Sequence, residues 1–131
     1  MDSSQYSLRR IPQIVNGISS QIAIIAGEGP FTVAQDNLGK VWAWGHDGFG
    51  QLGDGNYGQG ETRETPQKVT TQGGTELGSV DSLGAGHFHA VAESGGTLYS
   101  WGSNLDWRLG QGDLVNNLTL RARAYETVQP Q

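Results

Sequence analysis

The feature that most constrains the fold is an internal repeat. The segment "GKVWAWGHDGFGQLGDG", residues 39–55, aligns without a gap with "GTLYSWGSNLDWRLGQG", residues 96–112. Both copies hold a Trp-Gly pair, at Trp44-Gly45 and at Trp101-Gly102, and a Leu-Gly pair further along. Repeated units of this kind stack on their neighbours, because one unit cannot bury its hydrophobic face alone. We therefore expect the chain to consist of stacked copies of one small unit.

The repeat continues on both sides of this segment. Upstream, "IIAGEGPFTVA", residues 24–34, matches "SLGAGHFHAVA", residues 82–92. Downstream, "PQKV", residues 66–69, has an earlier echo in "PQIV", residues 12–15, and a weaker later one in "YETV", residues 125–128. The repeat predicts an end strand of a preceding unit within residues 1–20, a first unit over 21–70 and a second over 71–131.

Each unit reads as short strands joined by Gly, Asn and Asp turns, since no segment has the period of an amphipathic helix. The continuous apolar run at residues 21–26 predicts a strand covered on both faces. Four short antiparallel strands with one long loop are typical of a propeller blade. The predicted fold class is all-β, as a partial propeller or one completed by other copies or chains. The predicted strands cover residues 21–26, 31–35, 40–44, 66–70, 79–85, 88–93, 97–101 and 124–128.

These motifs resemble the regulator of chromosome condensation repeat, in the frame A-G, A-x-A, G-x-V/L-W/Y-x-W-G, Q-L-G-x-G and P-x-x-V. His89 stands at the usual histidine of that family, and the second copy replaces "GFGQLG" with "LDWRLG". The resemblance implies a β-propeller, usually of about seven blades, whereas two repeats cannot close a ring. The chain is then a piece of a larger propeller, a subunit that closes a ring with its own copies, or an open array on a partner; we favour the first two.

A glycine motif raises the question of a cofactor. Gly48, Gly50 and Gly53 have the G-x-G-x-x-G spacing of a dinucleotide-binding turn. Only Gly53 has a glycine counterpart in the second copy, and loop sequence follows where that fold needs a helix. We interpret these glycines as turn residues with positive φ and expect no cofactor.

Candidate catalytic and metal-binding groups are few. His87 and His89 could share a metal but lack an evident third ligand, so we interpret them as structural and predict no metal site. His46-Asp47 lacks a nucleophile pattern and is read as an exposed turn pair. Loop carboxylates could serve glycoside hydrolysis if they converged in one pocket, but a solvated loop is the expected state. We predict no enzyme and no catalytic residue. These carboxylates are Asp47, Asp54, Glu61 and Glu64.

The charge of the chain argues against a nucleic-acid surface. Thirteen acidic residues against eight basic ones leave a net charge of -5, whereas phosphate binding needs clustered Lys and Arg. The longest apolar run, Ile22 to Ala26, is too short to cross a bilayer. The N-terminus lacks the pattern of a secretory signal. We expect a soluble chain, with the cytoplasm favoured, and neither nucleic acid nor membrane as a partner.

The aromatic residues fall into two groups. Trp44 and Trp101 recur in register and are expected in the inter-blade core, as is Trp42, which aligns with Tyr99. Phe88 is also expected in the core. Trp107 instead replaces a glycine of the pattern, and Trp with Asp and Arg beside it is a mixture found at interface hot spots. The alternative is that it folds onto its own blade. The candidate partner-binding residues are Trp107, Asp106, Arg108, Phe49 and Tyr57.

The predicted function is a non-catalytic protein–protein interaction module that binds a partner of unknown identity through its long loops. The alternative is a structural assembly subunit that closes a propeller by self-association as a homo-oligomer. Two lesser alternatives are a guanine-nucleotide exchange factor, which the family resemblance suggests, and a carbohydrate-active enzyme that uses the loop carboxylates.

Overall fold

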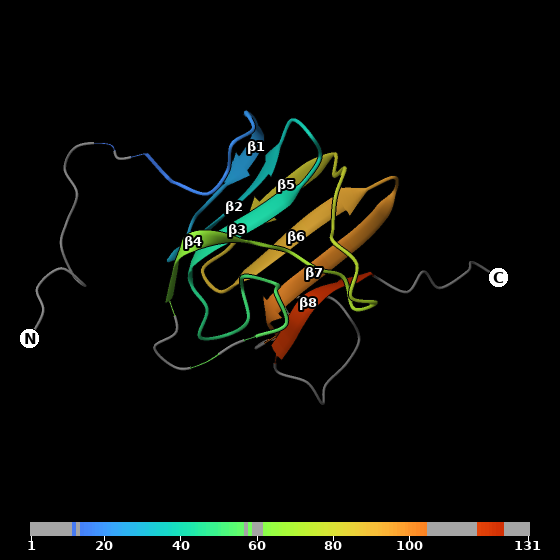
Figure 1. Ribbon diagram of the computed structural model, residues 1–131. Coiled ribbons are helices and arrows are strands. Elements are labelled where there is room, and N and C mark those ends of the chain that lie inside the picture. Colours follow the sequence, from blue (N-terminus) through green and yellow to red (C-terminus); the bar gives the residue numbers. More distant parts are fainter. Residues whose placement is uncertain (1–11, 13, 57, 59–61, 105–117, 125–131) are drawn as a thin grey trace, which may run out of the picture.

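The computed structural model describes residues 12, 14–56, 58, 62–104 and 118–124 of the chain. They form two antiparallel four-stranded sheets, and no helix occurs among them (Figure 1). The first sheet has the order β1-β2-β3-β4, with β1 at Ile22–Ala26, β2 at Phe31–Asp36, β3 at Val41–His46 and β4 at Thr62–Lys68. The second has the order β5-β6-β7-β8, with β5 at Ser82–Ala85, β6 at His89–Ser94, β7 at Thr97–Ser103 and β8 at Leu118–Ala124.

The all-β prediction and the repeated four-stranded unit are confirmed. The last strand begins earlier than predicted, because β8 spans Leu118–Ala124, whereas the prediction covered residues 124–128. Lys68 pairs with Trp42, and Ala124 pairs with Tyr99, the repeat counterpart of Trp42. Ala124 is therefore the counterpart of Lys68, and the echo that aligned "YETV" with "PQKV" was out of register. Residues 125–128 lie outside the described part of the chain.

Strand β1 differs from its prediction as a strand covered on both faces. It lies at the edge of its sheet, and Ile22 and Ile25 are 43% and 63% exposed. Its outer edge has no neighbouring strand among the described residues. The "PQIV" segment does not form a strand at residues 12 and 14–15, and the proposed division of the chain at residues 20 and 70 stays a prediction.

The Trp-Gly pair marks the same bulge in both sheets. The register between β3 and β4 shifts at Gly45, and that between β7 and β8 shifts at Gly102. Both glycines have positive φ, 109° and 99°. The next residue in each case donates its N–H to a carbonyl across the turn, His46 to Pro30 at 3.0 Å and Ser103 to Phe88 at 2.8 Å. The glycine allows the backbone to come this close.

The hydrophobic core lies between the two sheets, which stand side by side with β5 next to β1 and β2 (Figure 1). Burying one face of each sheet against the other is the main favourable contribution of such a stack. The core takes side chains from both sheets and from the linker between β4 and β5. Its members are Phe31, Val33, Val41, Ala43, Leu52, Val69, Leu77, Val80, Ala90, Ala92, Trp101 and Ala122.

A buried glutamine fastens the linker to the first sheet. The Gln35 side chain donates to the carbonyl of Val80 at 2.9 Å and accepts the N–H of Val80 at 2.6 Å. The amide thus pairs with the backbone as a neighbouring strand would, and Gln35 is only 7% exposed. Beside it, Ser79 donates its N–H to the carbonyl of Gly39 at 2.8 Å. These bonds set the position at which the second sheet begins.

Candidate functional site

The loop that follows β3 is ordered by a buried carboxylate. Asp47 is fully buried, and its Oδ1 accepts the N–H of Leu52 at 3.1 Å. Its carbonyl accepts the N–H groups of Gly50 at 3.3 Å and Gly58 at 3.2 Å. Asp47 was predicted in an exposed turn and a solvated loop, and this prediction is wrong. The carboxylate satisfies the N–H of Leu52 and the Asp47 carbonyl satisfies two more backbone donors, which an exposed turn would leave to water.

His46 and Gln51 make a second set of hydrogen bonds in this loop. The Nδ1 atom of His46 accepts the N–H of Gly48 at 3.2 Å and the side-chain amide of Gln51 at 2.9 Å. The Oε1 atom of Gln51 accepts the N–H of Phe49 at 2.8 Å. Gln51 is fully buried. The bonds fix the backbone that carries Phe49.

The loop of the first blade is held by a tryptophan of the second. Trp101 is fully buried and donates its indole N–H to the carbonyl of Gln51 at 2.9 Å. A Cβ atom on Gly53 would come within 2.9 Å of the indole, so glycine is required there for the close approach. The prediction that Trp101 lies in the inter-blade core is confirmed. The predicted positive φ is confirmed at Gly50 and Gly53, 76° and 66°, but is wrong for Gly48, which is not among the glycines with positive φ.

Two aromatic rings meet where the first loop reaches the second blade. The ring centroids of Phe49 and Phe88 are 4.8 Å apart, and His46 lies 6.3 Å from Phe88. His87 packs edge-on against Phe88 at 6.0 Å. Phe88 was predicted in the core, but it is only half-buried, as is Phe49, because the turn before β6 lies at the end of the sheet. We call these four residues the aromatic cluster.

The aromatic cluster lies at one end of both sheets, which we call the loop face. It comprises the turn at residues 27–30, the described part of the loop at 47–58 and the turn at 86–88. The two turns touch, since a Cβ atom on Gly29 would lie 2.4 Å from the Cα of His87. The loop face therefore joins backbone from both blades into one surface.

The candidate partner-binding residues are only partly placed. Phe49 lies in the aromatic cluster, whereas Tyr57, Asp106, Trp107 and Arg108 lie outside the described residues. Among the described residues no three acidic or histidine side chains come together as metal ligands. The structure also places two of the candidate loop carboxylates. Asp54 accepts the N–H of Asn56 at 3.0 Å, and Glu64 is exposed on β4; Glu61 is not described.

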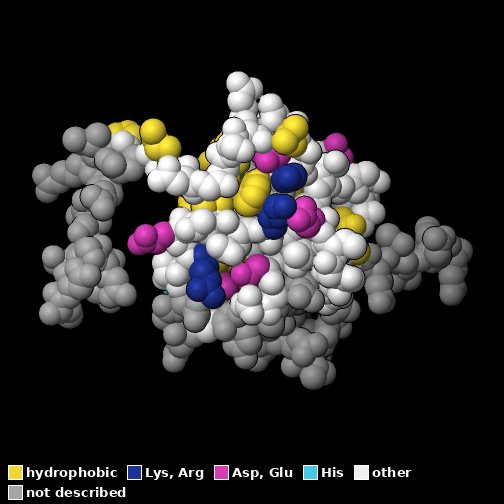
Figure 2. All heavy atoms as spheres, viewed as in Figure 1, with side chains coloured by type: hydrophobic (Ala, Val, Ile, Leu, Met, Phe, Trp, Pro, Cys, Tyr) yellow, Lys and Arg dark blue, Asp and Glu magenta, His cyan; other side chains and the backbone are white. Residues whose placement is uncertain are grey.

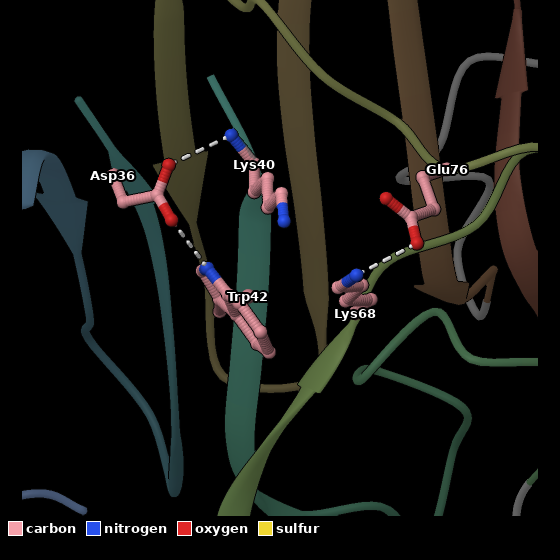
Figure 3. Close-up of polar contacts among 5 residues, drawn as sticks. All are labelled: Asp36, Lys40, Trp42, Lys68 and Glu76. Carbon is pink, nitrogen blue, oxygen red and sulfur yellow. Dashed lines mark hydrogen bonds and ion pairs between the residues drawn. The ribbon is translucent and has the colours of Figure 1, made fainter. Parts of the chain in front are cut away.

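The opposite end of the first sheet holds a second buried carboxylate, which the sequence reading missed (Figure 3). Asp36 accepts the N–H groups of Leu38 at 3.0 Å and Lys40 at 2.9 Å, and the indole N–H of Trp42 at 3.0 Å. Burial on its own raises the pKa of Asp36, but these bonds and the Lys40 charge outweigh it and place the pKa below its ordinary value of 3.8. The "DNLG" turn was the available signal, because Asp before Gly often bonds its own turn.

The lowered pKa of Asp36 predicts how acid weakens the fold. A carboxylate with a lowered folded pKa stabilises the protein above its unfolded pKa, and this contribution disappears as the pH falls through the folded pKa. We expect Asp36→Asn to lower the free energy of unfolding at pH 7 by about 1–3 kcal/mol, since one bond partner is lost. Urea unfolding at pH 7 and pH 3 should show a smaller loss on acidification for the variant than for the wild type. Asp54→Asn is the control, with a change at pH 7 within about 0.5 kcal/mol. An unchanged acid response in Asp36→Asn would contradict the assignment.

Basic and acidic side chains are interspersed on the face of the molecule seen in Figure 2. Figure 2 shows Lys and Arg side chains next to Asp and Glu on this face, and Lys68 and Glu76 form an ion pair of 2.9 Å. This face thus lacks the continuous basic surface that phosphate binding requires. No helix of the described residues could span a membrane. The absence of nucleic-acid and membrane partners stays a prediction, as does the compartment.

The chain matches one family model and is similar in sequence to known proteins. The family model "Regulator of chromosome condensation (RCC1) repeat" matches residues 39–92. The chain is 32% identical over 117 residues to the ultraviolet-B receptor UVR8 of Arabidopsis thaliana. This alignment covers 87% of this chain and 23% of the receptor. This chain therefore spans about a quarter of the length of that relative.

Solved structures share the fold at low sequence identity. Human WBSCR16 has a TM-score of 0.72 and 19% identity, over 89% of this chain and 28% of that one. Yeast RCC1 (Prp20), solved bound to Kap60, has a TM-score of 0.61 and 19% identity, over 84% and 26%. At this identity the likeness concerns the fold alone. The family model and the sequence relatives show that the chain belongs to the RCC1 repeat family, and the shared fold identifies its two sheets as blades of a β-propeller.

Proposed function

We propose that the chain is a non-catalytic protein–protein interaction module that binds its partner through the loop face. The observation that carries the proposal is the Phe49–Phe88 pair, with ring centroids 4.8 Å apart and both rings half-buried. Each ring comes from a different blade. Half-buried aromatic side chains on a rigid support are the residues that contribute most to protein interfaces.

The support beneath the pair makes it rigid. Phe49 is held by the N–H bond to Gln51, which itself bonds His46, and the Gln51 carbonyl binds Trp101. A partner that contacts Phe49 therefore meets a side chain already in place and loses little conformational entropy on binding. Yeast RCC1 (Prp20), a protein that shares this fold, has been solved bound to another protein, Kap60.

The sequence extends the proposed surface to Trp107, Asp106, Arg108 and Tyr57. Trp107 is the sequence counterpart of Gly50, in the part of the chain that follows β7 and lies outside the described residues. The corresponding loop of the first blade carries Phe49. Variation between repeats that is concentrated in loops on a common scaffold favours binding there.

An enzymatic role has less support. The carboxylate of Asp47, a candidate for sugar hydrolysis, is fully buried and occupied by the N–H of Leu52. It stabilises the loop and cannot reach a substrate. An exchange-factor role rests on the family resemblance, and the chemistry of the described residues does not add to it. We propose that partner binding is the activity of this part of the chain.

The test is a quantitative binding comparison. Proteins captured from a cell extract by the wild-type chain would be identified, and the strongest would be purified for titration. We expect Phe49→Ala and Trp107→Ala each to weaken its binding by about 30-fold or more, as for hot-spot residues, with folding intact. Leu38→Ala is the matched control, because Leu38 is 70% exposed in the turn between β2 and β3, at the other end of the sheet. Equal binding by Phe49→Ala and the wild type would contradict the proposal.

A further inference from the structure

The first sheet presents a tryptophan that its counterpart in the second sheet buries. Trp44 pairs with Thr32 across β3 and β2, as Trp101 pairs with Ala90 across β7 and β6. Trp101 and Ala90 are fully buried against the first blade. Trp44 and Thr32 are only half-buried, and no strand of the described residues packs over them. We call this face of the first sheet the leading flank, defined by Thr32, Trp42 and Trp44.

In the second sheet it is the other face that is more exposed than its counterpart. Val33 and Val41 of the first sheet are 0% and 1% exposed, because the second blade covers them. Their counterparts by register are Val91, which is half-buried, and Leu98, which is 47% exposed. We call this face the trailing flank, defined by Val91, Glu93 and Leu98.

The contact between the two blades shows what fits each flank. There, the leading side of the second sheet packs on the trailing side of the first, and Ala90, Trp101, Val33 and Val41 are buried. The leading flank of the first sheet and the trailing flank of the second repeat these two surfaces. We propose that they bind each other between copies of this chain, in a head-to-tail contact. Such an interface is heterologous, and it forms a ring when the rotation between copies closes.

Trp44 is the central residue of the proposed contact. Its counterpart Trp101 donates the indole N–H to the carbonyl of Gln51 at 2.9 Å. The other tryptophan of the leading flank is already partnered, since Trp42 donates to Asp36 at 3.0 Å and has the Lys68 ammonium 5.5 Å from its ring centroid. The structure shows no hydrogen bond for the Trp44 indole within the described residues. A blade that packed on the leading flank as the second sheet packs on the first would cover the Trp44 ring.

A closed propeller needs more blades than the two described here, since propellers contain about four to eight. A ring of copies would bury every exposed flank, which two blades alone cannot do.

The test uses light scattering after size exclusion over a range of concentrations. The wild type should form a discrete oligomer whose mass is a multiple of the monomer mass. Trp44→Ala on the leading flank and Leu98→Asp on the trailing flank should each weaken association by about 30-fold or more. Thr32→Arg is a second leading-flank variant, should Trp44→Ala fail to fold by circular dichroism. Leu38→Asp is the matched control, an exposed leucine on neither flank, and it should associate like the wild type.

Mixing the two flank variants gives the decisive result. Trp44→Ala keeps its trailing flank and Leu98→Asp keeps its leading flank, so an equimolar mixture should form one-to-one pairs that do not grow further. A monomeric wild type, or a mixture that does not pair, would overturn the proposal and assign the flanks to a blade of another chain. Phe49→Ala should leave self-association unchanged, so failure here is distinguishable from failure of the proposed loop-face binding.

Discussion

Replacing Gly102 with alanine should lower the free energy of unfolding by about 2–6 kcal/mol, from backbone strain and overpacking together. The residue has φ of 99°, and an added Cβ atom would lie 2.4 Å from the carbonyl oxygen of Phe88 and 2.9 Å from the Cα of His89. Both obstacles are backbone atoms, one in the turn before β6 and one at the start of β6, which cannot move aside as a side-chain tip can. Urea denaturation followed by circular dichroism measures the loss.

Gly95→Ala is the control that separates the two causes. Gly95 also has positive φ, 57°, but an added Cβ atom would meet nothing within 4 Å. Its cost should be limited to the backbone strain of about 1 kcal/mol. If both variants lost the same stability, the close approach of β6 to the Trp-Gly bulge would not be the reason for glycine at Gly102.

Truncating Trp101 to alanine should cost about 3–5 kcal/mol, the range for a large aromatic side chain removed from a core. Trp101 is fully buried between the blades and bonds the Gln51 carbonyl. The matched variant is Trp44→Ala, measured at a concentration where the chain is monomeric. Trp44 occupies the same position in the first blade but is only half-buried, so its loss should be less than half as large.

Trp101→Phe divides the effect of this residue into packing and hydrogen bonding. Phenylalanine keeps most of the apolar contact but cannot donate to the carbonyl, which is then left buried without that donor, at a cost of about 1–3 kcal/mol. Thermal unfolding of the three variants in parallel would measure these differences. Equal losses for Trp101→Ala and Trp44→Ala would contradict the inter-blade role of Trp101.

The repeat in the sequence was sufficient to predict the sheets. Trp44-Gly45 and Trp101-Gly102 aligned the two copies, and strands separated by turn residues then fell into four per unit, as the structure shows. The weak echo at "YETV" failed, because four residues that share one valine carry too little information to set a register. Only the pairing of Ala124 with Tyr99 placed β8.

The repeat did not predict which polar side chains are buried. Asp47 and Gln51 stand among glycines and polar residues, a context typical of a solvated loop, yet both are fully buried. Each side chain accepts a backbone N–H, from Leu52 and from Phe49, and the sequence does not distinguish one backbone N–H group from another. Gln35 bonds Val80, 45 residues away, and such a contact exists only once the blades have stacked.

The sequence by itself determined the repeated unit, its strands and the family, because glycine spacing and tryptophan positions follow from local backbone and packing requirements. The tertiary structure decided which copies of those residues are covered. Trp44 and Trp101 are equivalent in sequence, but one is half-buried and the other fully buried. The physical reason is that burial in a stacked array depends on whether a neighbouring blade is present, and the pattern within one repeat does not contain that information.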